Sequence, residues 1–140
     1  MKKNFATVSL LAIFTINTLS SCKKSKECED AGLGGELTVV ATLKHHSKII
    51  YNQGNYNDTV FVKYNAQDLP GLEPSDYDTY FVGDSGEDHV HLEALKCGQY
   101  YLFGAGFDTT ITMRVIGGIP FNTDQKEGEV EIVIPVTEGD

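Results

Sequence analysis

Alternation of apolar and polar residues over short segments constrains the fold of this chain most strongly. Between residues 36 and 44, one face of an extended chain would carry Leu37, Val39, Ala41 and Leu43. Residues 129–136 alternate in the same way, with Val130, Ile132, Ile134 and Val136 on one side. A period of two predicts half-buried β-strands, and no segment shows the pattern of an amphipathic helix. We therefore expect an all-β protein.

Turn-forming residues separate further short strands. We expect these strands at 59–64, 80–82, 89–92, 99–105 and 109–116, with a short apolar piece at 49–51. Residues 99–105 are apolar on both faces, which predicts a central strand. Seven or eight short strands with turns between them predict an antiparallel sandwich.

Several local expectations accompany this assignment. In the strand at 109–116, the inward side chains would be Ile111, Met113 and Val115, and Gly117, Gly118 and Pro120 would end it. Pro135 cannot donate a ladder hydrogen bond, so its end of the last strand is expected at an edge. Residues 65–79 form a long loop, and long loops in compact domains are often binding segments.

The segment 83–102 resembles the hallmark of prealbumin-like modules, which include collagen-adhesin B-type and carboxypeptidase regulatory-like domains. Its parts are the acidic-glycine turn 84–86, the strand 89–92, Leu95-Lys96-Cys97-Gly98 and the aromatic pair 100–101. The resemblance covers about residues 36–137 and implies an antiparallel Greek-key sandwich. It says little about function, because one fold hosts many functions.

Two departures from that family bear on activity. Some relatives carry a lysine–asparagine cross-link between the first and last strands; Lys44 could supply the lysine, but residues 129–137 contain no asparagine. The transthyretin-like hydrolases end in Tyr-Arg-Gly-Ser, whereas this chain ends in Val-Thr-Glu-Gly-Asp. A hydrolase of that type is therefore the weakest of the alternatives.

The first 22 residues resemble a bacterial lipoprotein signal. Two lysines precede a mostly apolar stretch over residues 5–19, and two serines come before Cys22. Such an order is typical of secretory signals, and the stretch is shorter than the roughly 20 residues of a spanning helix. The resemblance implies cleavage before Cys22 and lipidation of Cys22, which would place the protein in the bacterial cell envelope, at the periplasmic or surface face of the outer membrane. An ordinary secretory signal is the alternative.

The cysteines and the segment boundaries follow from that signal. If Cys22 carries lipid, Cys28 and Cys97 are left in a compartment that permits disulfides, and we predict that they pair. The alternative is two free thiols. We expect residues 1–21 to be the signal, 22–35 the lipidated cysteine and a flexible tether, and 36–140 the β-sandwich domain.

Charge and motifs narrow the function. The formal net charge is −9, with 20 acidic and 11 basic residues, which disfavours nucleic acid as a partner. The sequence shows no phosphate-binding glycine loop, nucleophile elbow or catalytic triad. We therefore expect a non-catalytic module, without a cofactor, that meets the membrane through its lipid and an envelope protein or glycan through its loops.

The strongest candidate for a chemical site is a metal site at His89, His91 and Glu93. Residues i, i+2 and i+4 of a strand point the same way, and two imidazoles with a carboxylate suit zinc. His45 or His46 would assist if their strand lies close. The plain alternative is a solvated strand face opposite the inward Val90 and Leu92.

Two weaker candidates lie in turns and loops. Asp84, Glu87 and Asp88 could hold calcium, although their spacing does not match a calcium loop. Loop tyrosines suit contacts with proteins or sugars, and they could equally cap the ends of the sandwich. These tyrosines are Tyr51, Tyr56, Tyr77 and Tyr80.

Overall fold

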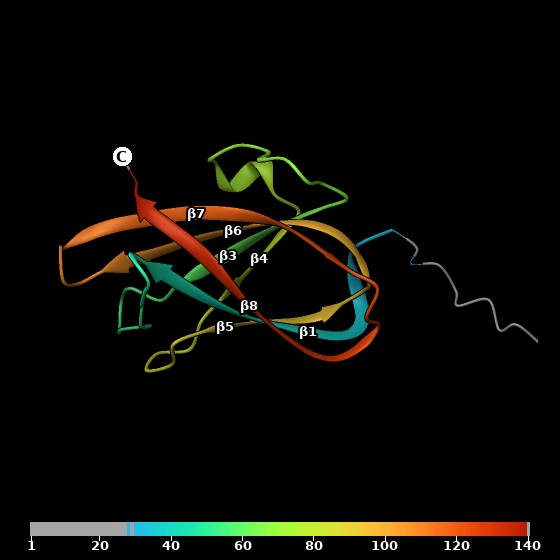
Figure 1. Ribbon diagram of the computed structural model, residues 1–140, viewed down its shortest axis with the longest axis horizontal. Coiled ribbons are helices and arrows are strands. Elements are labelled where there is room, and N and C mark those ends of the chain that lie inside the picture. Colours follow the sequence, from blue (N-terminus) through green and yellow to red (C-terminus); the bar gives the residue numbers. More distant parts are fainter. Residues whose placement is uncertain (1–27, 29, 140) are drawn as a thin grey trace, which may run out of the picture.

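The computed structural model describes residue 28 and residues 30–139, which build a curled, sandwich-like β-structure (Figure 1). The strands are β1 (Leu33–His45), β2 (Lys48–Ile49), β3 (Thr59–Tyr64), β4 (Thr79–Val82), β5 (Val90–Leu95), β6 (Gly98–Asp108), β7 (Met113–Thr123) and β8 (Glu127–Glu138). A short 3₁₀ helix, η1 (Pro74–Asp76), precedes β4. The prediction of an all-β fold is confirmed. No helix in this part of the chain has the length and apolar character needed to cross a bilayer.

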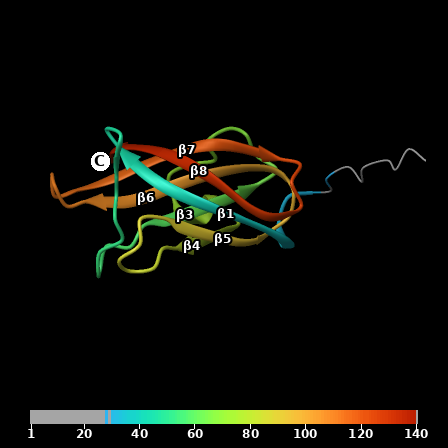
Figure 2. The ribbon, with the colours of Figure 1, turned by 60° about the horizontal axis from the view of Figure 1, so that its bottom comes forward.

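The strands form one sheet that curls back on itself, in the order β2-β1-β8-β7-β6-β3-β4, with β5 added to β1 (Figures 1 and 2). β6 lies inside this order, as predicted. Most neighbours are antiparallel, but β1 and β8 run parallel over ten residue pairs, from Glu36 opposite Glu127 to His45 opposite Val136. The prediction of a wholly antiparallel sandwich is wrong at this ladder. Alternation specifies which face of a strand is buried but not the direction of its neighbour.

The core lies inside the curl of the sheet. The predicted inward residues of β1 are fully buried, and they meet buried residues of β3, β5, β6, β7 and β8. The largest fully buried side chains include Tyr100, Leu37, Leu43, Leu92, Leu95, Leu102 and Ile134. Each fully buried aliphatic side chain stabilises the fold by about 1.5–3 kcal/mol relative to exposure.

A second, smaller cluster covers the outer face of β6. Tyr77 packs against Tyr101 and Phe103, together with Phe61 of β3. Its ring stacks on that of Phe103 with centroids 5.7 Å apart, and its hydroxyl donates to the Gly71 carbonyl at 2.8 Å. The segment between β3 and β4 therefore folds over the sheet, which explains why β6 is apolar on both faces.

β7 begins and ends later than predicted. Residues 109–112 form the turn from β6, where the Asp108 carboxylate accepts the Thr110 N–H at 2.8 Å. Ile111 and Met113 are consequently exposed, at 42% and 44%, while Val115 is buried as expected. Gly117, Gly118 and Pro120 do not end the strand. Pro120 has no N–H, but β7 pairs with β8 only at Val115 and Ile116, so no second ladder requires that donor. Pro135 of β8 likewise lies before the β7–β8 ladder, which begins at Thr137.

β1 also starts earlier than expected, at Leu33 rather than Glu36. Ala31 is buried in the core, so part of the segment assigned to a flexible tether belongs to the fold. A Cβ on Gly35 would lie only 2.0 Å from the Leu95 carbonyl oxygen. This glycine therefore serves close packing of β1 against β5 rather than flexibility.

Candidate functional site

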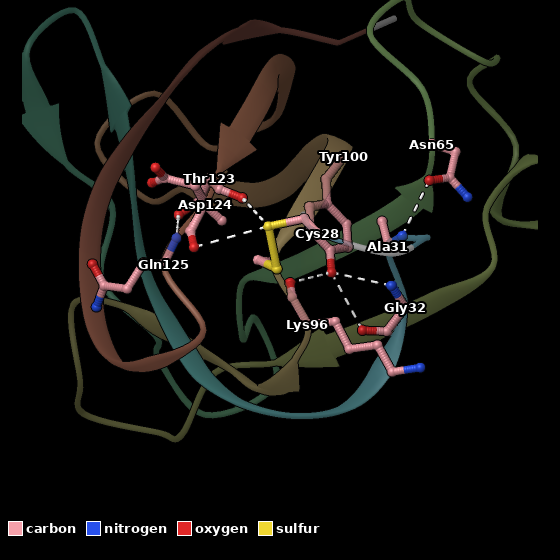
Figure 3. Close-up of a disulfide and its surroundings, with 10 residues drawn as sticks. Cys28, Ala31, Gly32, Asn65, Lys96, Tyr100, Thr123, Asp124 and Gln125 are labelled. Atoms are coloured by element: carbon pink, nitrogen blue, oxygen red, sulfur yellow. Dashed lines mark hydrogen bonds between the residues drawn. A yellow bond between two sulfur atoms is a disulfide. The ribbon is translucent and has the colours of Figure 1, made fainter. Parts of the chain in front are cut away.

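A disulfide closes the end of the sandwich at which β1 begins (Figure 3). Cys28 and Cys97 are bridged, with their Cα atoms 5.5 Å apart, so the predicted pairing is confirmed. Sγ of Cys28 also lies 3.9 Å from the carbonyl oxygens of Thr123 and Asp124. The bridge thus ties the residues before β1 to the loop before β6, beside the connection from β7 to β8. Residues 1–27, including Cys22, lie outside the described residues.

Tyr100 supports the same end from inside (Figure 3). Its fully buried side chain places the hydroxyl where it accepts the Gly32 N–H at 3.1 Å and donates to the Lys96 carbonyl at 2.6 Å. Burial raises the pKa of Tyr100, so the hydroxyl keeps the proton that it donates. Gly98, with φ +146°, lets Ala31 approach, since a Cβ there would lie 2.9 Å from the Ala31 Cβ.

Glu87, His89 and His91 meet at the start of β5 and could hold a metal ion. Nε2 of His89 lies 2.9 Å from Nε2 of His91 and 3.5 Å from a carboxylate oxygen of Glu87. On the other side of the ring, Asp88 lies 2.8 Å from Nδ1 of His89. An ionised carboxylate only accepts hydrogen bonds, so Nδ1–H of His89 donates to Asp88 and the lone pair of the neutral ring is on Nε2. Carboxylates orient metal-binding histidines in this way.

Glu93 is not part of this group, which corrects the predicted ligand set. The pairing of β5 with β1 becomes irregular beyond Leu92, and Ala94 has a left-handed φ of 57°. Burial still alternates through Leu92 and Glu93, so Glu93 lies on the exposed face with His91, but its carboxylate does not join the ligand group. Glu87 comes instead from the turn before the strand, where sequence alternation gives no signal.

The histidine pair borders a groove on the outer face of β1, β5 and β8, with a volume of about 510 Å³. His91 lies beside Val40 of β1, which in turn lies beside Glu131 of β8. Lys44 and Asp88 also line this groove. The groove therefore carries both signs of charge around the half-buried imidazole of His89 and the exposed imidazole of His91.

His45 and His46 do not join His89 and His91. His91 pairs with the middle of β1, whereas His45 ends that strand and is 2% exposed. Its Nδ1 lies 2.8 Å from Asp108, and its Nε2 faces Glu138, as does Nε2 of His46. Asp108, assisted by Glu138, raises the pKa of His45, and His45 lowers the pKa of Asp108.

The acidic turn between β4 and β5 does not gather its carboxylates around one point. Asp84 is exposed, while Asp88 and Glu87 both face His89. The turn is organised by Asn52, which is fully buried, donates to the His89 carbonyl at 3.0 Å and accepts the Asp58 N–H. These contacts favour a structural turn over the calcium alternative.

The four tyrosines expected on binding loops have different environments. Tyr77 is 9% exposed and belongs to the cluster over β6, so it is a structural residue. Tyr80 is exposed but lies within β4. Tyr51 and Tyr56 are exposed on the segment between β2 and β3, and Tyr56 stacks on Phe107 with centroids 4.4 Å apart. Only these two lie on a loop and face solvent.

Sequence reasoning missed the buried carboxyl of Asp58. The residue is fully buried, and neither carboxyl oxygen has a hydrogen-bond partner. Burial raises its pKa from 3.8 to about 7. A charged residue in a turn-rich segment is ordinarily exposed, so no pattern in the sequence indicated this burial.

Comparison of the chain with protein-family models, with curated proteins and with solved structures finds no match.

Proposed function

We propose that this chain is an exported, lipid-anchored β-module of the bacterial cell envelope that binds a partner or holds structure rather than catalysing a reaction. The Cys28–Cys97 disulfide is the observation that carries this proposal. The sequence contains three cysteines, so the bridge leaves Cys22 as the one available for acylation. Structural disulfides also persist in oxidising compartments outside the cytoplasm.

The bridge limits how far the folded domain can lie from the lipid anchor. An extended chain spans at most about 3.6 Å per residue, so lipid on Cys22 would hold Cys28 within about 20 Å of the membrane surface. β1 runs away from that end to His45 (Figure 1). The end that carries His45 and the turn between β6 and β7 would then face away from the bilayer, where a partner can reach it.

A prealbumin-like Greek-key arrangement is our proposal for the finer topology. The family's cross-link implies that the first and last strands lie side by side, and β1 and β8 are neighbours here. In that register Lys44 lies opposite Pro135, which offers no amide side chain for a cross-link. The proposal therefore concerns the arrangement of strands and includes no cross-link.

Metabolic labelling tests the anchor. Cells grown with an alkyne analogue of palmitate should label the wild-type chain, which should fractionate with membranes. Cys22→Ser should abolish the label and leave the signal uncleaved. The double variant Cys28→Ser/Cys97→Ser is the matched control and should retain the label. Label that survives Cys22→Ser, or a wild-type chain that takes none, would contradict lipidation.

A second candidate function is metal binding at Glu87, His89 and His91. It is favoured by the Asp88 contact that leaves a lone pair on Nε2 of His89, facing the ring of His91. His46→Asn first removes a ligand of the separate group formed by His45, His46 and Glu138. Zinc titration of this full-length variant should give heat, and adding His91→Asn should remove that heat. Glu93→Gln, the control, should leave the heat unchanged. Equal heat with and without His91 would exclude this site.

A further inference from the structure

Three potential metal ligands meet at the end of the sandwich opposite the disulfide. His45 is the last residue of β1, His46 begins the turn to β2, and Glu138 is the last residue of β8. The parallel pairing of β1 with β8 brings them together, since His45 lies opposite Val136. One atom of each side chain lies within 4.8 Å of the other two, in a group separate from Glu87, His89 and His91.

The imidazole of His45 presents a buried nitrogen, Nε2, that makes no hydrogen bond and lies 3.5 Å from an oxygen of Glu138. Its Nδ1 lies 2.8 Å from Oδ2 of Asp108, whose other oxygen accepts the Thr110 N–H. Because the carboxylate accepts a hydrogen bond from Nδ1–H, the lone pair is on Nε2 in the neutral ring, which is the form that binds a metal. This Nε2 is inaccessible to solvent and has no hydrogen-bond partner. A carboxylate on Nδ1 and a free Nε2 are the features of an oriented metal-binding histidine.

The distances from the two imidazole nitrogens to Glu138 match a coordination shell better than hydrogen bonds. Nε2 of His45 and Nε2 of His46 lie 3.5 Å and 3.6 Å from the same oxygen of Glu138. Hydrogen bonds from nitrogen to oxygen centre near 2.9 Å. Bonds of about 2.0–2.2 Å around a tetrahedral zinc ion separate its ligands by roughly 3.3–3.6 Å.

The turn after β1 orients the second imidazole. His46 and Ser47 have φ values of 45° and 67°, and they join the paired residues His45 and Lys48. Two left-handed residues in a two-residue hairpin loop are typical of type I′ turns, which favour asparagine and glycine. Here the turn places the ring centroids of His45 and His46 4.2 Å apart. The side chains of His46 and Glu138 are 74% and 47% exposed, so an ion can enter from solvent.

We propose that His45, His46 and Glu138 form a binding site for a divalent transition metal, best fitted to Zn²⁺, with Asp108 as the residue that positions His45. Two imidazoles and one carboxylate suit zinc, whereas calcium and magnesium prefer oxygen ligands alone. Three protein ligands leave the fourth coordination position directed to solvent or to a partner. The site does not depend on the lipid anchor. It would place a metal ion at the end of the domain that faces away from the membrane in the proposed orientation.

Calorimetric titration of the full-length protein with zinc tests this site. The protein is purified in mild detergent, stripped with a chelator, and carries His91→Asn to remove the other histidine cluster. We expect one zinc ion per chain with micromolar or tighter affinity. His46→Asn should weaken binding about tenfold or more, and asparagine tolerates the left-handed backbone of the turn. Asp108→Asn should weaken it by about 10–100-fold, as for other residues that orient ligands.

Glu131→Gln, on the same strand as Glu138, is the matched control and should leave the affinity unchanged. Nuclear magnetic resonance of the imidazole nitrogens adds a readout that does not depend on folding of the variants. Zinc should shift Nε2 of His45 and of His46, while Nδ1 of His45 stays protonated. An absence of zinc heat, an affinity unaffected by His46→Asn, or zinc-induced shifts confined to other nitrogens would overturn the proposal.

Discussion

Asp58 lies in an environment that is unusual for a carboxyl group. Its carboxyl is fully buried, both oxygens lack partners, and its pKa is raised to about 7 by burial. A Cβ on Gly106 would lie 2.3 Å from one of these oxygens, so the backbone of β6 presses directly against the carboxyl. The neutral acid is therefore the form that suits the fold.

Stability should consequently fall as the pH rises. With a pKa of 3.8 unfolded and about 7 folded, the folded chain binds more protons between these values, so the free energy of unfolding decreases across that window. The loss has an upper limit of about 4 kcal/mol, at about 1.4 kcal/mol per pKa unit. Asp58→Asn removes this titration and should gain stability over the wild type from about pH 4 to about pH 8. Urea unfolding at several pH values measures the difference, and a difference independent of pH would show that Asp58 is ionised in the fold.

The histidines show what residue-level reasoning could and could not predict. The pairing of His89 with His91 follows from the two-residue period of a strand, and their rings do meet. The third ligand could not be predicted, because Glu87 belongs to a turn whose path depends on Asn52, far away in the sequence. The cluster of His45 with Glu138 depends on the parallel β1–β8 ladder, which alternation does not encode.

At the scale of elements, the segment between β3 and β4 is a cover for the sheet. Tyr77 fills the space above Phe61 and Phe103, so this loop is part of the packed structure. Its two prolines and its charge indicated a loop, but its contact with the outer face of β6 arises only when that strand is surrounded by β3 and β7. Local alternation predicts where a strand lies, but it does not indicate which segment covers that strand or pairs with it.

Tyr77→Ala should destabilise the protein by about 3 kcal/mol or more, the usual cost of removing a buried aromatic side chain. Tyr51→Ala is the control, since Tyr51 is 51% exposed and surface substitutions change stability by about 0.5 kcal/mol at most. Chemical denaturation of the two variants measures both values. Equal effects would mean that the loop does not pack on the sheet in solution.

The whole molecule is a short β-structure closed at one end by a covalent bridge and carrying histidine–carboxylate clusters elsewhere. The bridge spans 69 residues of sequence, and closing a loop of that size stabilises the fold by about 4 kcal/mol in the chain-entropy model. Cys28→Ser/Cys97→Ser should lower the free energy of unfolding by about that amount. Reductant should do the same to the wild type and leave the double variant unchanged. Equal stability of wild type and double variant would show that the bridge does not constrain the chain.

We propose that Cys22 carries the lipid and that the Cys28–Cys97 bridge keeps the folded domain close to that anchor. Intact-mass spectrometry of the wild-type protein extracted from membranes, before and after reduction, tests both halves together. We predict a chain that begins at Cys22, carries the added mass of acyl groups, and gains the mass of two hydrogens on reduction. An unmodified chain that retains residues 1–21 would contradict lipidation, and a mass unchanged by reduction would contradict the bridge.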